Sequence, residues 1–182
     1  MTHPLKHYDF LLLRSYDDEP AFFAQMGRFF ASATVRRDCG GYPLNDSPRH
    51  RWFIVRRHNH ARVLGFISIE LQSGTVRIRD GYIRPEARQL GLFRALRQRV
   101  LDYIDDLDQP CTLRVPWLSA ALLQPYGFQP HTSRGNWTTL KRNAHATSRQ
   151  PGEPGQDAVQ RTGQPADPAT DRSHQPDPPV PA

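Results

Sequence analysis

The chain has 182 residues, of which 37% are hydrophobic and 23% charged, which suits one globular domain with its own core. Its 24 Lys and Arg against 18 Asp and Glu give a net charge of +6, which favours anionic ligands. Neither the two cysteines nor the apolar run at residues 10–13 has the pattern of a metal site, a signal peptide or a membrane span. We therefore expect a cytoplasmic protein without structural disulfides, bound metal or membrane contact.

The composition changes near Asn143. From Ala144 onward there is no aromatic residue, Leu, Ile, Met or Cys, while Pro, Gly, Gln and Asp are abundant. Such a segment cannot bury enough apolar surface to offset the entropy lost on ordering it. We predict a folded domain over residues 1–143 and a disordered tail over residues 144–182. The tail has three arginines and five acidic residues, a net charge of −2, which leaves +8 on the domain.

The first part of the chain predicts a strand, a helix and a hairpin. Residues 8–14 read as a strand, and the acids and proline at residues 17–20 are a helix-start signal. One face of that helix carries large apolar side chains, namely Phe22, Phe23, Met26, Phe29 and Phe30. Residues 52–57 and 62–71 are two β-rich runs joined by residues 58–61, which predicts a hairpin.

A strand, a loop and a second helix follow. Residues 75–83 alternate with the two-residue period of a strand, and Pro85 ends it. Apolar residues then recur at helical spacing: Leu92, Leu96, Val100, Ile104 and Leu107. The helix start carries arginines and its end aspartates, the reverse of what the helix dipole prefers. Because a helix N-terminus presents unpaired N–H groups, this pattern favours an anion site, with a merely solvated helix face as the alternative.

The remaining elements complete a mixed fold. Residues 111–116 read as a strand that would lie parallel to residues 75–83 after the helical crossover. A Gly127-Phe128 turn and a last strand starting at Trp137 follow. The chain is therefore predicted to be an α/β (α+β) protein with a largely antiparallel sheet.

The segment Arg88-Gln89-Leu90-Gly91-Leu92-Phe93 is similar to the R/Q-x-x-G-x-G/A loop with which GNAT-superfamily N-acetyltransferases hold the pyrophosphate of acetyl-CoA. The order of elements from residue 52 to residue 142, including the Gly-Phe turn, resembles that family as well. The resemblance implies a mixed, mostly antiparallel central sheet flanked by helices. It also implies a splayed parallel strand pair that forms the acyl-CoA cleft, bordered by residues 82–84 and residues 115–118.

By this resemblance, acetyl-CoA would be the acyl donor and would contact one continuous region. Its expected binding residues are Tyr82, Ile83, Arg84, Arg88, Gln89, Leu90, Gly91, Leu92, Phe93 and Arg94. Two positions depart from the family pattern. Phe93 replaces a small residue in the loop, and Leu123 stands where many members have a tyrosine general acid.

Direct acyl transfer needs a base for the amine and an acid for the departing thiolate. Glu70 and Asp80 are the candidate bases, and Tyr126 is the candidate acid. The alternative for both carboxylates is an ion pair with nearby arginines, and a site that relies on water is a third reading.

Three functions remain open. The leading prediction is an N-acyltransferase that moves an acetyl or other acyl group from acetyl-CoA to a primary amine of a small molecule or a protein. The second is the same chemistry on a nucleic-acid-linked amine, such as charged tRNA or a nucleobase, which the +8 domain favours. The third is a catalytically silent GNAT-like binding module, which the two departures favour. The resemblance also leaves pairing into a homodimer open.

Overall fold

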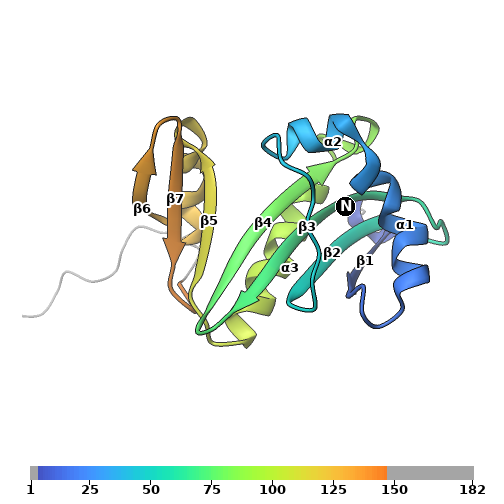
Figure 1. Ribbon diagram of the computed structural model, residues 1–182, viewed down its shortest axis with the longest axis horizontal. Helices are drawn as coiled ribbons and strands as arrows, with labels where there is room; N and C mark the ends of the chain where they lie inside the picture. Colours follow the sequence, from blue (N-terminus) through green and yellow to red (C-terminus); the bar gives the residue numbers. More distant parts are fainter. Residues whose placement is uncertain (1–3, 147–182) are drawn as a thin grey trace, which may run out of the picture. The chain divides into compact units, whose positions relative to one another are not determined.

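The computed structural model describes residues 4–146, and the predicted tail from residue 147 onward lies outside the described residues. Figure 1 shows the arrangement of the elements. The strands are β1 (Tyr8–Leu13), β2 (His50–Arg57), β3 (Val63–Gln72), β4 (Thr75–Ile83), β5 (Cys111–Pro116), β6 (Gln129–Arg134) and β7 (Trp137–Arg142). The α-helices are α1 (Glu19–Ala31), α2 (Ala33–Asp38) and α3 (Leu92–Asp106). The 3-10 segments are η1 (Pro4–His7), η2 (Pro85–Ala87) and η3 (Trp117–Tyr126).

The strands form one sheet in the order β1-β2-β3-β4-β5-β7-β6. Every neighbouring pair is antiparallel except β4 and β5, which run parallel. The parallel pair is joined only from Val76–Cys111 to Ile78–Leu113, and beyond it the two strands diverge (Figure 1). The predicted mixed α/β fold, with its splayed parallel pair, is therefore confirmed.

Two apolar cores hold the sheet between helices. The helix α3 packs on one face, where Leu92, Leu96 and Val100 are buried against the strands. The helices α1 and α2 cover β1–β3 on the opposite face, where Phe29 and Trp52 belong to an aromatic cluster. Burial of such rings contributes about 1.5–3 kcal/mol each, so these cores place β4 and the start of α3 firmly.

Helix α1 begins where the sequence predicts. The Asp18 carboxylate accepts a hydrogen bond from the Ala21 amide at 3.0 Å, and Pro20 lies in the first turn, where its missing N–H costs nothing. The predicted stripe of α3 needs one correction, because α3 ends at Asp106 and Leu107 is 36% exposed. The buried set of α3 instead includes Leu101, which the predicted stripe left out.

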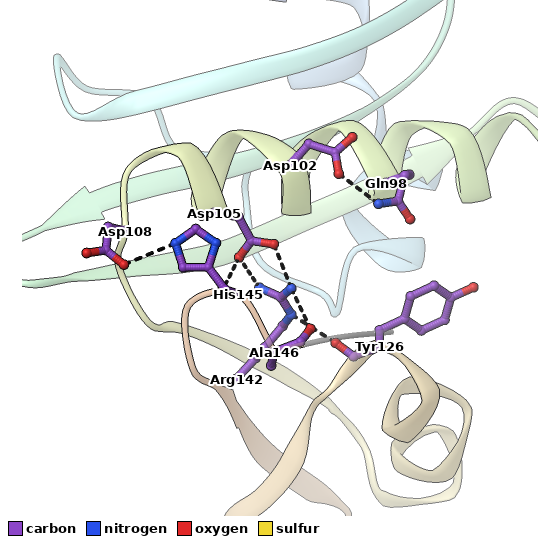
Figure 2. A network of polar contacts seen from close by, with 8 residues as sticks. All are labelled: Gln98, Asp102, Asp105, Asp108, Tyr126, Arg142, His145 and Ala146. Atoms are coloured by element: carbon purple, nitrogen blue, oxygen red, sulfur yellow. Dashed lines mark hydrogen bonds and ion pairs between the residues drawn. The ribbon is translucent and has the colours of Figure 1, made fainter. Parts of the chain in front are cut away.

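The end of the described chain is tied to α3 by a polar network (Figure 2). The buried Arg142 of β7 donates to both carboxylate oxygens of Asp105, at 2.6 and 2.8 Å. Its Nε also donates to the Tyr126 carbonyl at 2.9 Å, and the His145 amide donates to Asp105 at 2.9 Å. Described structure thus extends to Ala146, three residues beyond the domain end predicted at residue 143.

Among the described helices, none combines the length and apolar character that a membrane crossing requires.

Candidate active site

The loop between β4 and α3 borders a pocket of about 710 Å³. Gly91 caps α3 with a φ of 75°, and Gln89 also has a positive φ, of 64°. The first N–H groups of α3, from Leu92 onward, have no partners within the helix and lie beside this pocket. An ideal Cβ on Gly91 would have no neighbour within 4 Å, so the backbone there is open to a ligand. The loop thus has the properties of an anion site.

Most of the residues predicted to bind acetyl-CoA line this pocket. They are Tyr82, Ile83, Arg88, Gln89, Gly91, Leu92, Phe93 and Arg94. Arg84 and Leu90 do not line it. The Arg84 guanidinium instead donates to the Val63 carbonyl at 2.8 Å and stacks on Phe29, and Leu90 borders a smaller pocket on the far side of the loop.

Arg88 is held at the edge of the loop pocket by two partners. Its Nε donates to the Ile83 carbonyl at 3.0 Å, and its Nη2 lies 3.2 Å from an Asp38 carboxylate oxygen. The carboxylate comes from the end of α2, so the loop and α2 are linked through this side chain. A bound phosphate would compete with Asp38 for the guanidinium, because both are anions that arginine binds through the same N–H groups.

Phe93 does not crowd the glycine of the loop. An ideal Cβ on Gly81 of β4 would lie 2.9 Å from Phe93 ring atoms, which shows that the ring packs directly on that strand. A side chain at position 81 would therefore displace the Phe93 ring from this strand. Phe93 lines both the loop pocket and the neighbouring cleft, and it stands at their junction.

A cleft of about 770 Å³ passes between β4 and β5 where the two strands diverge. Apolar side chains of the α3 side line one end, including Val100, Leu113 and Phe128. The other end opens beside α2 and is polar. The charged residues that line the cleft as a whole are Arg37, Asp38, Arg79, Asp80, Arg97 and Arg114. On the β4 side the cleft lies along residues 78–81, a few residues before the predicted border at 82–84.

Asp80 is the predicted base that lines the cleft. Burial raises its pKa above the ordinary value, although Arg79, a hydrogen bond with Ser68 and Arg77 each lower it. Within residues 4–146 no ion pair to Asp80 is present, so the structural pairing that the sequence left open is not formed. A carboxylate with a raised pKa is a better proton acceptor at neutral pH.

Cys39 also lines the cleft, and its Sγ lies 3.8 Å from the Gly81 carbonyl. Burial raises the pKa of this thiol to about 12. The thiol is therefore protonated at neutral pH and is a poor nucleophile.

The other predicted catalytic residues lie outside the cleft lining. Glu70 lies on β3 and forms an ion pair with Arg79 at 3.4 Å. The Tyr126 hydroxyl accepts a hydrogen bond from Arg97, whose guanidinium stacks on the tyrosine ring at 3.9 Å. Three residues of η3 border the cleft, namely Ser119, Leu122 and the buried Leu123.

Sequence reasoning did not find several residues of the cleft. Asp38, Cys39, Arg114 and Trp137 line it, and the Arg114 guanidinium lies 5.0 Å from the Trp137 ring centre. Arg114 could have been found from the sequence, because it lies in the predicted strand 111–116, which was expected to run beside the strand that contains Asp80. Within residues 4–146, no three His, Cys, Asp or Glu side chains gather as a metal site.

Comparison with known proteins finds relatives by structure only, since no family model and no curated protein sequence matches this chain. An acyl-CoA N-acyltransferase from Pseudomonas aeruginosa superposes with a TM-score of 0.60 at 19% identity, covering 74% of this chain and 99% of that one. The ribosomal-protein-S18-alanine N-acetyltransferase from Escherichia coli gives 0.56 at 15% identity, with 78% and 97% covered. An acetyltransferase of the GNAT family from Staphylococcus aureus gives 0.52 at 11% identity, with 75% and 99% covered. The chain therefore has the fold of the GNAT N-acetyltransferases, which confirms the predicted resemblance at the level of the fold.

Proposed function

We propose that this protein is an acyl-CoA-dependent N-acyltransferase that moves an acetyl or other acyl group to a primary amine. The observation that carries the proposal is the continuity of the two pockets. The loop pocket and the cleft share Asp38, Gly81 and Phe93, so a ligand whose phosphates contact the loop can extend its acyl end into the cleft.

The chain's own residues supply the steps of direct transfer. The loop amides and Arg88 would bind the pyrophosphate of acetyl-CoA, and Asp80 would accept the proton of the attacking amine. The amine nitrogen forms a bond to the thioester carbonyl carbon, and the carbon–sulfur bond breaks to release the CoA thiolate. The protonated Cys39 supports this direct route over an acyl-cysteine intermediate.

Tyr126 is the least supported of the predicted catalytic residues, since it does not line the cleft and its hydroxyl accepts a hydrogen bond from Arg97. Solvent water entering the polar end of the cleft is the simpler proton donor for the thiolate. Glu70 is likewise better explained by its ion pair with Arg79. We therefore place the base role on Asp80.

The test is thiol release from acetyl-CoA by the full chain, measured with a panel of small amines, lysine peptides and aminoacyl-RNA. Mass spectrometry of each acceptor shows whether it gains one acetyl group. We expect amine-dependent release, with acetylated product in the same reaction. No release with any acceptor, in a folded protein that binds acetyl-CoA, would contradict the proposal and favour the silent module.

A further inference from the structure

Part of one face of the sheet is not covered by any of the described helices. In β5 and β7, one set of alternating side chains packs inward against η3 and α3; buried Leu140 and Arg142 are members of that set. The other set points to the side of the sheet on which α1 and α2 lie, but those helices cover only β1–β3 and the end of β4 at Tyr82 (Figure 1). We call this bare side of β4, β5, β7 and β6 the outer face.

The strand register arranges the side chains of the outer face in rows across the sheet. Arg77 of β4 pairs with Thr112 of β5, which pairs with Lys141 of β7. In the next rows Arg114 lies beside Thr139, and Trp137 beside Arg134. Neighbouring strands are about 4.8 Å apart, so cations and threonine hydroxyls alternate over a flat surface.

Across β5, β7 and β6 the charge of this surface has one sign, whereas on the β4 side Arg77 lies opposite Glu70 of β3. From Cys111 to Arg142 the chain contains no aspartate or glutamate. Four outer-face cations are exposed, namely Arg77, Arg114, Arg134 and Lys141. Within the described residues none of these four forms an ion pair. The surface is therefore free to bind an anion without breaking an existing pair.

The outer face leads into the polar end of the cleft. Arg114 and Trp137 belong to both, and the stacking of the guanidinium on the indole holds this edge in place. The Trp137 ring reaches within 3.7 Å of an ideal Cβ on Gly40, so it closes the space between the outer face and the loop after α2. A polyanion lying on the outer face would thus pass the opening beside Asp80.

We propose that the outer face binds single-stranded nucleic acid and presents an amine of that nucleic acid, or of a group attached to it, to the cleft. The acceptor part of this inference rests on the proposed function, whereas the binding part does not. Arginine, lysine and threonine are the side chains that contact phosphates, and a flat sheet with an aromatic side chain is a known platform for single strands. The row of Arg77, Thr112 and Lys141 presents no apolar side chain as an anchor for a protein partner, which favours nucleic acid over an acidic peptide.

The test measures the affinity of a fluorescein-labelled 20-nucleotide single-stranded RNA by anisotropy over a series of salt concentrations. The test variant is Arg77→Gln/Arg134→Gln/Lys141→Gln, which removes three outer-face cations that do not line the cleft. The matched control is Lys6→Gln/Arg28→Gln/Arg57→Gln, which removes the same charge from exposed positions on η1, α1 and β2. Melting curves of all three proteins show that they are folded.

We expect the outer-face variant to weaken RNA binding at least tenfold and to lower the slope of log affinity against log salt by about 2, since each phosphate contact to a single strand contributes about 0.7. The control should weaken binding less than twofold. Three results would each overturn the proposal. The outer-face variant and the control could weaken RNA binding equally, or the unaltered chain could fail to bind RNA. Poly-glutamate could also displace the labelled RNA as well as unlabelled RNA does.

Acetyl-CoA binding by the same three proteins separates the two proposals. If all three bind acetyl-CoA and none binds RNA, the outer-face inference alone fails. If RNA binding follows the expected pattern while none binds acetyl-CoA, the binding surface stands and the acyltransferase function fails.

Discussion

The two halves of the sheet differ in what covers them. Strands β1–β3 lie between α3 on one face and α1 with α2 on the other, and Trp52, Ile54 and Phe66 are completely buried there. Strands β5 and β7 are covered on one face only, and every residue of the edge strand β6 is exposed. Strands β1–β3 therefore contribute most of the buried core, whereas β5, β7 and β6 leave a charged face available for binding. The cleft lies at the boundary, because strands belonging to two differently packed layers are free to diverge.

The largest expected effect is on stability in the covered half. Phe66→Ala should lower the free energy of unfolding by about 4 kcal/mol, since Phe66 packs against Phe29 and Trp52 and its removal leaves a cavity. Thr139→Ala on the outer face should change it by less than about 0.5 kcal/mol. Urea unfolding monitored by circular dichroism measures both. A similar loss of unfolding free energy in the two variants would mean that the two halves of the sheet contribute equally to stability.

The stability of the second half of the sheet, strands β5, β7 and β6, is expected to depend on the ion pair between Arg142 and Asp105. Arg142→Ala should cost about 3 kcal/mol, because it leaves the Asp105 carboxylate without the partner that holds it (Figure 2). The hydrogen bonds from Arg142 are also the largest cause of the lowered pKa of Asp105. A lowered pKa stabilises the fold above the unfolded value near 3.8 and stops doing so as the pH falls through the folded value.

The unaltered chain should therefore lose more stability than Arg142→Ala as the pH falls below about 4. Urea unfolding at pH 7 and at pH 3 gives the four free energies. If the difference in unfolding free energy between the unaltered chain and Arg142→Ala is the same at pH 7 and at pH 3, the assigned role of the ion pair is contradicted.

At the boundary, Asp80→Asn should lower kcat by about 100-fold if Asp80 is the base. The same substitution should stabilise the protein at neutral pH, because burial raises the pKa of Asp80. A carboxyl with a raised folded pKa loses stability as the pH rises from its unfolded value through its folded value, and asparagine has no such loss. Thiol release and urea unfolding at pH 7 check the two expectations. Unchanged kcat would remove Asp80 from the mechanism.

The smallest expected effect concerns the junction of the two pockets. Phe93→Ala should raise the ratio of kcat/KM for butyryl-CoA to that for acetyl-CoA by about tenfold, because the ring on Gly81 narrows the path into the cleft. Competition between the two thioesters in one reaction measures the ratio. A ratio equal to that of the unaltered chain would show that the ring does not limit the acyl group.

Local patterns predicted much of the fold. The bounds of β4 and β5 agree with the predicted strands at residues 75–83 and 111–116, because alternation and length are local properties. The six-residue α2 was not predicted, since so short a helix shows no periodic stripe. Asp38 lies at the end of α2, so it was not identified as a site residue when that helix was not predicted.

The candidate site was harder to predict than the fold. Glu70 and Asp80 look alike in the sequence, as single carboxylates in strands rich in arginine. Only the structure separates them, because a register shift between Ile67 and Ile69 brings Asp80 to the diverging strands while Glu70 meets Arg79.

The central claim is that the loop before α3 binds the phosphates of acetyl-CoA. Calorimetric titration of Gly91→Glu against Gly74→Glu tests it most directly, since both glycines have a positive φ, of 75° and 71°, with open space around them. The two variants therefore carry similar backbone strain and the same added charge. We predict saturable micromolar binding by the unaltered chain and by Gly74→Glu, and none by Gly91→Glu. Equal affinity in both variants, or no binding by the folded unaltered chain, would contradict the claim.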